Sequence, residues 1–290
     1  MTRNYNNNYN PLPWYDSIER QDFRKSYVYG AVYPLFAPAN NLLPFQVLRT
    51  HRDAEITALE LLDRSGAVAA DILSAAKDAG LTVIQSADFP GMDVIVFAAN
   101  QYMATQMQEG QYYLRMTDSV ETWYSEVFTV VQDVSAYLSL EWWDDSNAVF
   151  DAGGIVYEYG YYRNRLYLNT ELGKPDYEYE ETGEDRDGYF FAEKQISEKT
   201  YKFQFLAPEF MCDAIRLARL SDHVTVRSQG IAYDCDTFLI TPKWEGAGAL
   251  ASVEAEIQTD TVCKKIGQGY VKAVRGDYNN DYNNDYNNGV

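Results

Sequence analysis

Cysteine and histidine are both scarce in this chain of 290 residues. The three cysteines, Cys212, Cys235 and Cys263, are an odd number and show no C-x-x-C spacing. This argues against a disulfide framework and against a structural zinc site. We expect the cysteines to be small buried apolar residues in a reducing compartment. The only histidines are His51 and His223, so histidine-based catalysis has few candidate residues.

No recognisable catalytic motif is present. Ser221, Asp222 and His223 are consecutive, but neighbours on an extended chain point to opposite faces, so their adjacency does not make a catalytic triad. The sequence contains no P-loop, no G-x-G-x-x-G and no H-E-x-x-H, the motifs that would indicate nucleotide binding or a zinc hydrolase. We therefore predict a protein that is not an enzyme, with no catalytic residue, no cofactor and no metal ligand.

Basic residues and long apolar runs are also few. Lys and Arg number 24 against 43 Asp and Glu, which gives a formal net charge of −19 and disfavours binding to phosphate backbones or anionic membranes. Nucleic acid is thus not an expected partner. No stretch approaches the roughly 18 apolar residues of a membrane span, and Met1 to Asn10 hold no secretory apolar region. We expect synthesis in the cytoplasm and no membrane span.

Aromatic residues, in contrast, are plentiful. The chain has 25 Tyr, 13 Phe and 5 Trp, residue types that favour strands and are enriched at protein interfaces. The composition therefore predicts a mainly β protein that has interaction surfaces.

Both ends are low in complexity. Residues 4–10 read NYNNNYN, and the tetrad DYNN occurs three times from Asp277 onward. Such polar tracts lack the aliphatic residues that would offset the entropy of ordering. We predict disordered Asn/Tyr-rich tails over residues 1–13 and 271–290.

The first half is predicted to form an immunoglobulin-like β-sandwich over residues 14–131. Its clearest feature is a hairpin around Asp118 to Glu121. An Ala-rich stretch, Val68 to Ala79, is predicted as a short helix ending at Gly80, and Trp14 to Lys25 is compatible with a helix or an extended arm. The predicted strands are Tyr27–Tyr33, Phe45–Arg49, Ile56–Asp63, Leu81–Gln85, Val94–Ala98, Gln111–Thr117 and Thr122–Val131.

The second half, residues 132–270, is predicted to be an antiparallel sandwich with one packed helix. Apolar residues recur at three- and four-residue spacing after Pro208, which predicts a helix over residues 208–220. The predicted strands are Tyr137–Trp143, Ile155–Tyr159, Arg165–Asn169, Tyr189–Glu193, Thr200–Leu206, His223–Ser228, Ile231–Ile240 and Leu250–Gln258.

A dense acidic run, DYEYEETGEDRD, occupies residues 176–187. Its carboxylates are hard oxygen donors of the kind that bind calcium, but their spacing does not match an EF-hand loop. We interpret the run as a mobile solvated loop, with a calcium site as the alternative.

Two adjacent tryptophans precede two aspartates at Trp142-Trp143-Asp144-Asp145. Tryptophans beside carboxylates are typical of sugar-binding sites and, with paired acids, of glycoside hydrolases. A strand that ends in a polar turn also explains the pattern, with one tryptophan facing the core and the other an interface. We favour the strand.

Several stretches resemble an uncharacterised family of structural proteins encoded by phages and prophages of gut Bacteroidetes. They are YVYGAVYP (27–34), YYLRMTD (112–118), WYSEVF (123–128), EWWD (141–144), FDAG (150–153), EKQISEKT (193–200), Trp244 and ASV (251–253). The resemblance implies a virion or tail role and assigns no catalytic residue. The segment from Pro208 to about Asp260 also resembles the sandwich-plus-helix plan of tail-tube and distal-tail proteins, a likeness of fold alone.

The hypothesis that follows is a virion structural protein, a tail, connector or baseplate component that forms a homo-oligomeric ring or docks onto one, with itself and other virion proteins as partners. A carbohydrate-binding or adhesion module of the particle is the first alternative, and a tail-associated glycan hydrolase the second.

Overall fold

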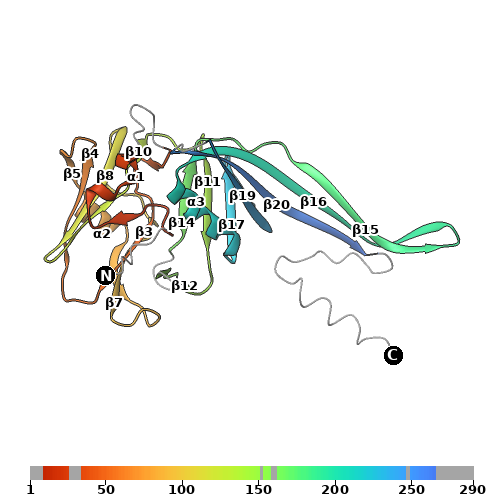
Figure 1. Cartoon of the computed structure of the whole chain (residues 1–290), viewed down its shortest axis with the longest axis horizontal. Coiled ribbons are helices and arrows are strands. Elements are labelled where there is room, and N and C mark those ends of the chain that lie inside the picture. Colours follow the sequence, from red (N-terminus) through yellow and green to blue (C-terminus); the bar gives the residue numbers. More distant parts are fainter. Residues whose placement is uncertain (1–8, 26–33, 151–152, 158–161, 246–248, 266–290) are drawn as a thin grey trace.

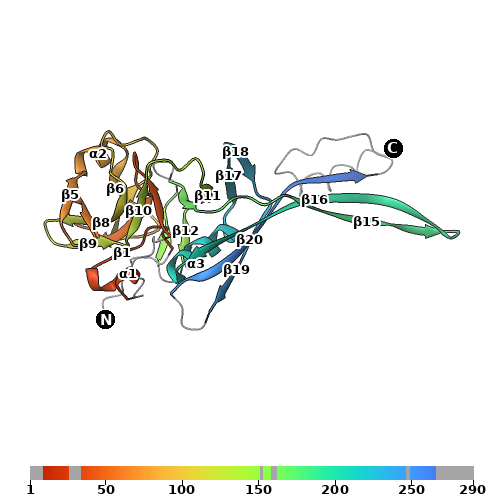
Figure 2. The same cartoon turned by 90° about the horizontal axis from the view of Figure 1, so that it is seen from above.

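Strands dominate the chain, which confirms the mainly β prediction. The computed structural model describes residues 9–25, 34–150, 153–157, 162–245 and 249–265. In Figure 1 and Figure 2 most strands gather in one part of the molecule, here called the body, and a long ribbon extends away from it. The predicted strand Tyr27–Tyr33, residues 1–8 of the first predicted tail and all of the second predicted tail lie outside the described residues. The disorder predicted for residues 9–13 is wrong, because Asn10 and Leu12 are buried in the fold.

The largest sheet runs through both halves of the chain. Its order is β1-β9-β8-β10-β2-β14-β11-β17-β18, and β4, which also carries β5, pairs with β8. The first and second halves join where β2 pairs in parallel with β10 and meets β14 at Phe36 and Tyr167. The strands are β1 (Trp14–Tyr15), β2 (Phe36–Pro38), β4 (Ile56–Asp63), β5 (Val68–Asp71), β8 (Gly110–Asp118), β9 (Thr122–Ser125), β10 (Phe128–Val131), β11 (Leu138–Trp143), β14 (Asn164–Leu168), β17 (His223–Ser228) and β18 (Ile231–Asp234).

Three smaller sheets complete the β structure. One has the order β3-β7-β6, one pairs β12 with β13, and one has the order β15-β16-β20-β19. Their strands are β3 (Phe45–Thr50), β6 (Leu81–Gln85), β7 (Met92–Phe97), β12 (Ala148–Phe150), β13 (Gly153–Ile155), β15 (Asp176–Arg186), β16 (Tyr189–Ala207), β19 (Thr237–Trp244) and β20 (Ala251–Lys265).

One hydrophobic cluster connects three of these four sheets, whereas Ile155 of β13 belongs to a second cluster with Val94 and Val96 of β7. The first cluster contains buried side chains from both halves of the chain, among them Phe45, Leu114, Leu140 and Ile257. Each such side chain contributes roughly 1.5–3 kcal/mol to folding by leaving water. Because the base of the β15-β16-β20-β19 sheet shares this core, that sheet is anchored in the body.

The helices are short. The helix predicted over 208–220 is confirmed as α3 (Glu209–Ile215) followed by a 3-10 turn, η2 (Arg216–Leu220), and its apolar side chains enter the core. The helix predicted over Val68–Ala79 is wrong in its first part, which forms β5 before α2 (Leu73–Asp78). A turn at Gly66, with φ of 88°, brings Val68 opposite Leu62, and this pairing outweighs the helix propensity of alanine.

A strap of N-terminal residues, Tyr9 to Lys25, crosses the body. It contains β1, a 3-10 turn η1 (Ile18–Arg20) and the single turn α1 (Asp22–Lys25), so it is neither one continuous helix nor one extended arm. Trp14 pairs with Ser125, and the Gln21 side chain donates to the Ser125 carbonyl at 2.6 Å.

Glu126, buried at the end of β9, holds this strap. One carboxylate oxygen accepts from the backbone N–H of Asp22 at 2.6 Å and from the Tyr15 hydroxyl at 3.2 Å. The other accepts from the N–H groups of Phe23 and Val127 at 3.2 and 3.0 Å. Burial raises the pKa of Glu126 to about 7, against the lowering effect of the three backbone donors.

No helix in the described ranges combines the length and the apolar character that crossing a bilayer requires.

Candidate assembly surface

The β15-β16-β20-β19 sheet begins as part of the core. On β16, Tyr201, Phe203 and Phe205 are buried, and they lie opposite Ile257, Ala255 and Val253 of β20. Every second residue points to this face, as the two-residue period of a strand requires. The base of the sheet is therefore a rigid support.

Beyond Thr200 the same strands leave the body, and we call this part the arm (residues 176–199 and 259–265). Figure 1 and Figure 2 both show β15 and β16 continuing well past the rest of the described fold. With 19 residues, β16 spans about 60 Å at ~3.3 Å per residue. The arm thus projects a large surface into solvent.

One face of the arm carries exposed aromatic side chains. Tyr177 and Tyr179 lie opposite Lys199 and Ser197, in line with the buried residues of the base. Their exposed fractions are 57% and 75%, so the face that is apolar core at the base becomes an uncovered tyrosine face outside. Val262, opposite Ser197, is also exposed. Tyrosine is among the residues most enriched at protein interfaces.

The opposite face of β15 is acidic. Asp176, Glu178 and Glu180 alternate with the tyrosines, and Glu178 lies directly opposite Glu198. Like charges in opposed positions destabilise a strand pair. Among the described residues, no basic side chain forms an ion pair with these three carboxylates of β15. A cationic partner would therefore reduce the repulsion between the carboxylates of the acidic face.

The outer end of the arm is a two-stranded ribbon. In the described part of the chain β20 reaches Lys265, opposite Lys194, so beyond this point β16 pairs only with β15 among the described residues. Asp187 and Gly188 close the ribbon with φ values of 51° and 81°, the positive pair of a type I′ turn. A two-stranded ribbon is only marginally stable by itself in water, and β15 is an edge strand that pairs only with β16 among the described residues.

The interpretation of residues 176–187 as a solvated loop is wrong, because most of this run is strand β15. The hairpin signal was present as Asp187-Gly188 between an alternating DYEYE segment and YFF. The many charged residues of this segment outweighed the hairpin signal, because a run of charged residues usually indicates a loop. In the arm both faces are solvated, so the charged side chains need no burial. For the calcium alternative, no group of three or more His, Cys, Asp or Glu side chains in the described ranges is placed to hold a metal ion.

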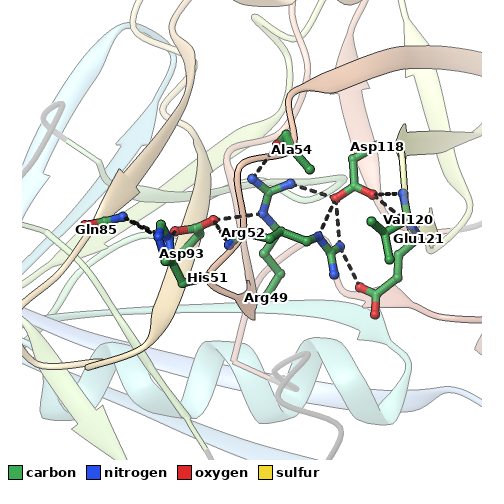
Figure 3. A network of polar contacts seen from close by, with 9 residues as sticks. All are labelled: Arg49, His51, Arg52, Ala54, Gln85, Asp93, Asp118, Val120 and Glu121. Atoms are coloured by element: carbon green, nitrogen blue, oxygen red, sulfur yellow. Dashed lines mark hydrogen bonds and ion pairs between the residues drawn. The ribbon is translucent and has the colours of Figure 1, made fainter.

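His51 belongs to a buried ion network in the body (Figure 3). At its centre is Arg49 of β3, with 2% of its side chain exposed. Its guanidinium donates to Asp93 at 3.1 Å, to Asp118 at 2.7 Å and to the Ala54 carbonyl at 2.6 Å. Strands β3, β7 and β8 are thereby tied together.

The rest of the network satisfies both aspartates. His51 Nδ1 is 2.7 Å from Asp93, and Arg52 contacts Asp118 at 2.7 Å. Burial opposes ionisation of Asp93, but the hydrogen bonds of His51, the Arg52 amide and Arg49 outweigh it, so the pKa of Asp93 lies below its ordinary value. Both buried aspartates thus accept hydrogen bonds from arginine side chains or backbone amides, an arrangement that stabilises the fold.

His223 does not belong to the ion network around Arg49. Its Nε2 lies 2.8 Å from Asp145, and its ring stacks on Trp143 with centroids 4.9 Å apart. Ser221 instead donates to the Leu217 carbonyl. The three consecutive residues 221–223 are therefore not arranged as a Ser-His-Asp triad.

The two tryptophans face opposite ways, as predicted. Trp142 is fully buried in the core, whereas Trp143 is partly exposed and has the Arg163 guanidinium carbon 4.0 Å from its ring centroid. Asp144 accepts from the backbone N–H of Asp222. Trp142 thus has no surface to offer a sugar.

The cysteines are all free thiols, but only Cys212 is buried. Cys235 and Cys263 are partly exposed, which corrects the expectation that all three are buried; both lie on or beside outer strands of the fold. Burial raises the pKa of the Cys212 thiol to about 11, so this thiol is unreactive at neutral pH. It lines a pocket of about 610 Å³ between α3 and β19, whose other residues include Glu209, Arg216 and Trp244.

Comparison with protein-family models, with curated proteins and with solved structures finds no match to this chain.

Proposed function

We propose that this chain is a structural protein of a phage virion, a tail, connector or baseplate component that assembles through its arm into a ring or onto one. The observation that carries the proposal is the tyrosine face of the arm. A folded core strand pair continues into solvent and there exposes Tyr177 and Tyr179 beside an unpaired strand edge. Contact with a second protein would cover both.

The acidic side chains of β15 serve the same role. Exposed strand edges invite indiscriminate pairing, and charged residues on an edge prevent it. Asp176, Glu178 and Glu180 would repel other copies of the same edge and admit only a partner of complementary charge. The arm therefore combines a tyrosine face that can bind a partner with an acidic face that restricts which partner binds.

The proposal extends to location and partners. The protein would be made in the cytoplasm of the bacterial host and carried in the particle, where its partners are copies of itself and other virion proteins. Two sandwich-like halves with low-complexity tails remain the proposed domain plan, with 14–131 as an immunoglobulin-like unit and 132–270 as a sandwich with a helix. No enzymatic step is part of the role.

The tyrosine face is tested by the double variant Tyr177→Ser/Tyr179→Ser. We expect the wild-type protein to sediment as an oligomer at micromolar concentration and the variant to associate at least about tenfold more weakly. The melting temperature should stay nearly the same because both side chains are largely exposed. Sedimentation velocity at several concentrations measures the association.

The matched control is Ile231→Ser, which removes an exposed apolar side chain from β18 instead, and it should assemble normally. A wild-type protein that remains monomeric at high concentration and is absent from purified particles by mass spectrometry would contradict the proposal.

A further inference from the structure

A second candidate surface lies on the body and carries the positive charge that the acidic face of the arm lacks. A pocket of about 490 Å³ lies where β2 and β14 meet the segment after β7. It contains two arginines and two tyrosines in a chain with a large acidic excess. The lining residues are Pro38, Asn41, Ala99, Asn100, Gln101, Tyr102, Arg163, Arg165 and Tyr167.

The two arginines share a single carboxylate. Glu141, which is buried, accepts from Arg165 Nε at 2.8 Å, while the nearest Arg163 nitrogen is 4.0 Å away. Arg163 keeps 43% of its side chain exposed and is held over the ring of Trp143. One guanidinium is therefore neutralised and the other is positioned, charged and accessible.

The rim of the pocket is a fixed loop. Asn41 Nδ2 donates to the carbonyls of Ala99 and Gln101 at 3.3 and 3.1 Å. Ala99 has a φ of 52°, a left-handed conformation that costs a non-glycine residue of order 1 kcal/mol. This loop presents Tyr102, which is 77% exposed. Tyr102 is thus displayed from a rigid support.

We propose that this pocket receives the arm of a second copy of the chain. The inference rests on the assembly function proposed above and names its contact. The carboxylates of Asp176, Glu178 and Glu180 would meet Arg163, and the arm would pass beneath Tyr102. Charge complementarity favours this occupant: among the described residues, no basic side chain pairs with the three carboxylates of the arm, and the Arg163 guanidinium lies 4.0 Å from the nearest carboxylate, that of Glu141.

The geometry favours an intermolecular contact. β14, beside the pocket, lies in the body, whereas β15 leads away from it in both views (Figure 1, Figure 2). The arm of one copy therefore extends away from its own body, which leaves it free to reach the pocket of another copy. An arm-to-pocket contact joins different patches on the two partners, and such head-to-tail contacts close into rings when the rotation between neighbours permits.

Two single substitutions test the contact. Arg163→Gln removes the accessible charge of the pocket while leaving the Arg165–Glu141 pair intact. Glu178→Lys reverses the side-chain charge on the arm at the position opposite Glu198. The new Lys–Glu pair should stabilise the arm itself. Each variant should self-associate at least about tenfold more weakly than wild type in sedimentation velocity.

Mixing the two variants gives the sharper result. Arg163→Gln keeps its arm and Glu178→Lys keeps its pocket, so an equimolar mixture should form two-chain complexes that contain one of each. Arg219→Gln, at an exposed position in η2, is the control and should assemble as wild type does.

The outcomes separate the two proposals. If wild type assembles while either variant assembles undiminished, or if the mixture forms no heterodimer, the arm-to-pocket contact is wrong and the assembly function stands. If wild type does not assemble at any concentration, both proposals fail.

Discussion

Replacing Arg49 with Met is expected to lower the free energy of unfolding by about 3–5 kcal/mol. The side chains of Arg49, Asp93 and Asp118 are only 2%, 4% and 0% exposed, so the two aspartates would stay buried after losing a shared partner. His51 and Arg52 would still contact the two aspartates. Both carboxylates would lose the hydrogen bonds from the Arg49 guanidinium. Urea denaturation followed by tryptophan fluorescence measures the change.

The control is an ion pair of the same kind on the surface. Lys202 and Glu256 are 3.4 Å apart, with 63% and 44% of their side chains exposed, and Lys202→Met should cost no more than about 1 kcal/mol. Equal losses in the two variants would show that the buried network contributes nothing special to stability.

The stability of the wild-type protein relative to Glu126→Gln should fall by about 3 kcal/mol between pH 4.5 and pH 8. The ordinary glutamate pKa of 4.5 applies to the unfolded chain, whereas burial raises the pKa of Glu126 to about 7 in the folded protein. Between these values the folded state holds a proton that unfolding releases, so stability decreases as pH rises. Below about pH 4.5 the contribution is fully present, and above about pH 7 it is lost.

Measuring both proteins at each pH cancels the other titrating groups. Glutamine is neutral at every pH, so the variant lacks this component while the ion network titrates equally in both. Glu19→Gln, at an exposed position in the same strap, should follow the wild-type curve. Parallel stability curves for wild type and Glu126→Gln would contradict the raised pKa and the control of the strap by this carboxyl group.

The strands of the body were predictable because their signals are local. The hairpin around Asp118 to Glu121, the strands at Ile56–Asp63 and Leu81–Gln85, and the helix after Pro208 all formed where the alternation or the three- and four-residue spacing placed them. The predictions were wrong where strand pairing outweighs local propensity. Val68, for example, pairs with Leu62 in a sheet despite the alanines that follow it.

The candidate surfaces were harder to predict for two different reasons. The arm had local signals in Asp187-Gly188 and in the alternation of tyrosines with acidic residues, but its dense charge suggested a loop because charge runs usually stay solvated. The pocket had no local signal at all. Tyr102 and Arg163 come from segments some 60 positions apart in the sequence, and only the meeting of β2 with β14 brings them together. Glu126 likewise gains its role from Asp22 and Phe23, distant along the chain.

The fold separates the features that stabilise the body from those that we propose for assembly. The body carries the stabilising network and the pocket with its fixed loop, and the arm carries tyrosines and carboxylates that contribute little to its own folding. Substitutions in the arm should therefore change association, whereas substitutions at Arg49 should change stability.

Hydrogen–deuterium exchange of the full chain at dilute and concentrated conditions tests the central claim, that the arm is the assembly element. In the single chain, about every second amide of β15 (Asp176–Arg186) points away from β16 toward the open edge of the sheet, so these amides should exchange quickly when dilute and slow at least about tenfold when the protein associates. The segments around Tyr102 and Arg163 should slow with them. Exchange in β15 that is equally fast in monomer and assembled oligomer would contradict the account.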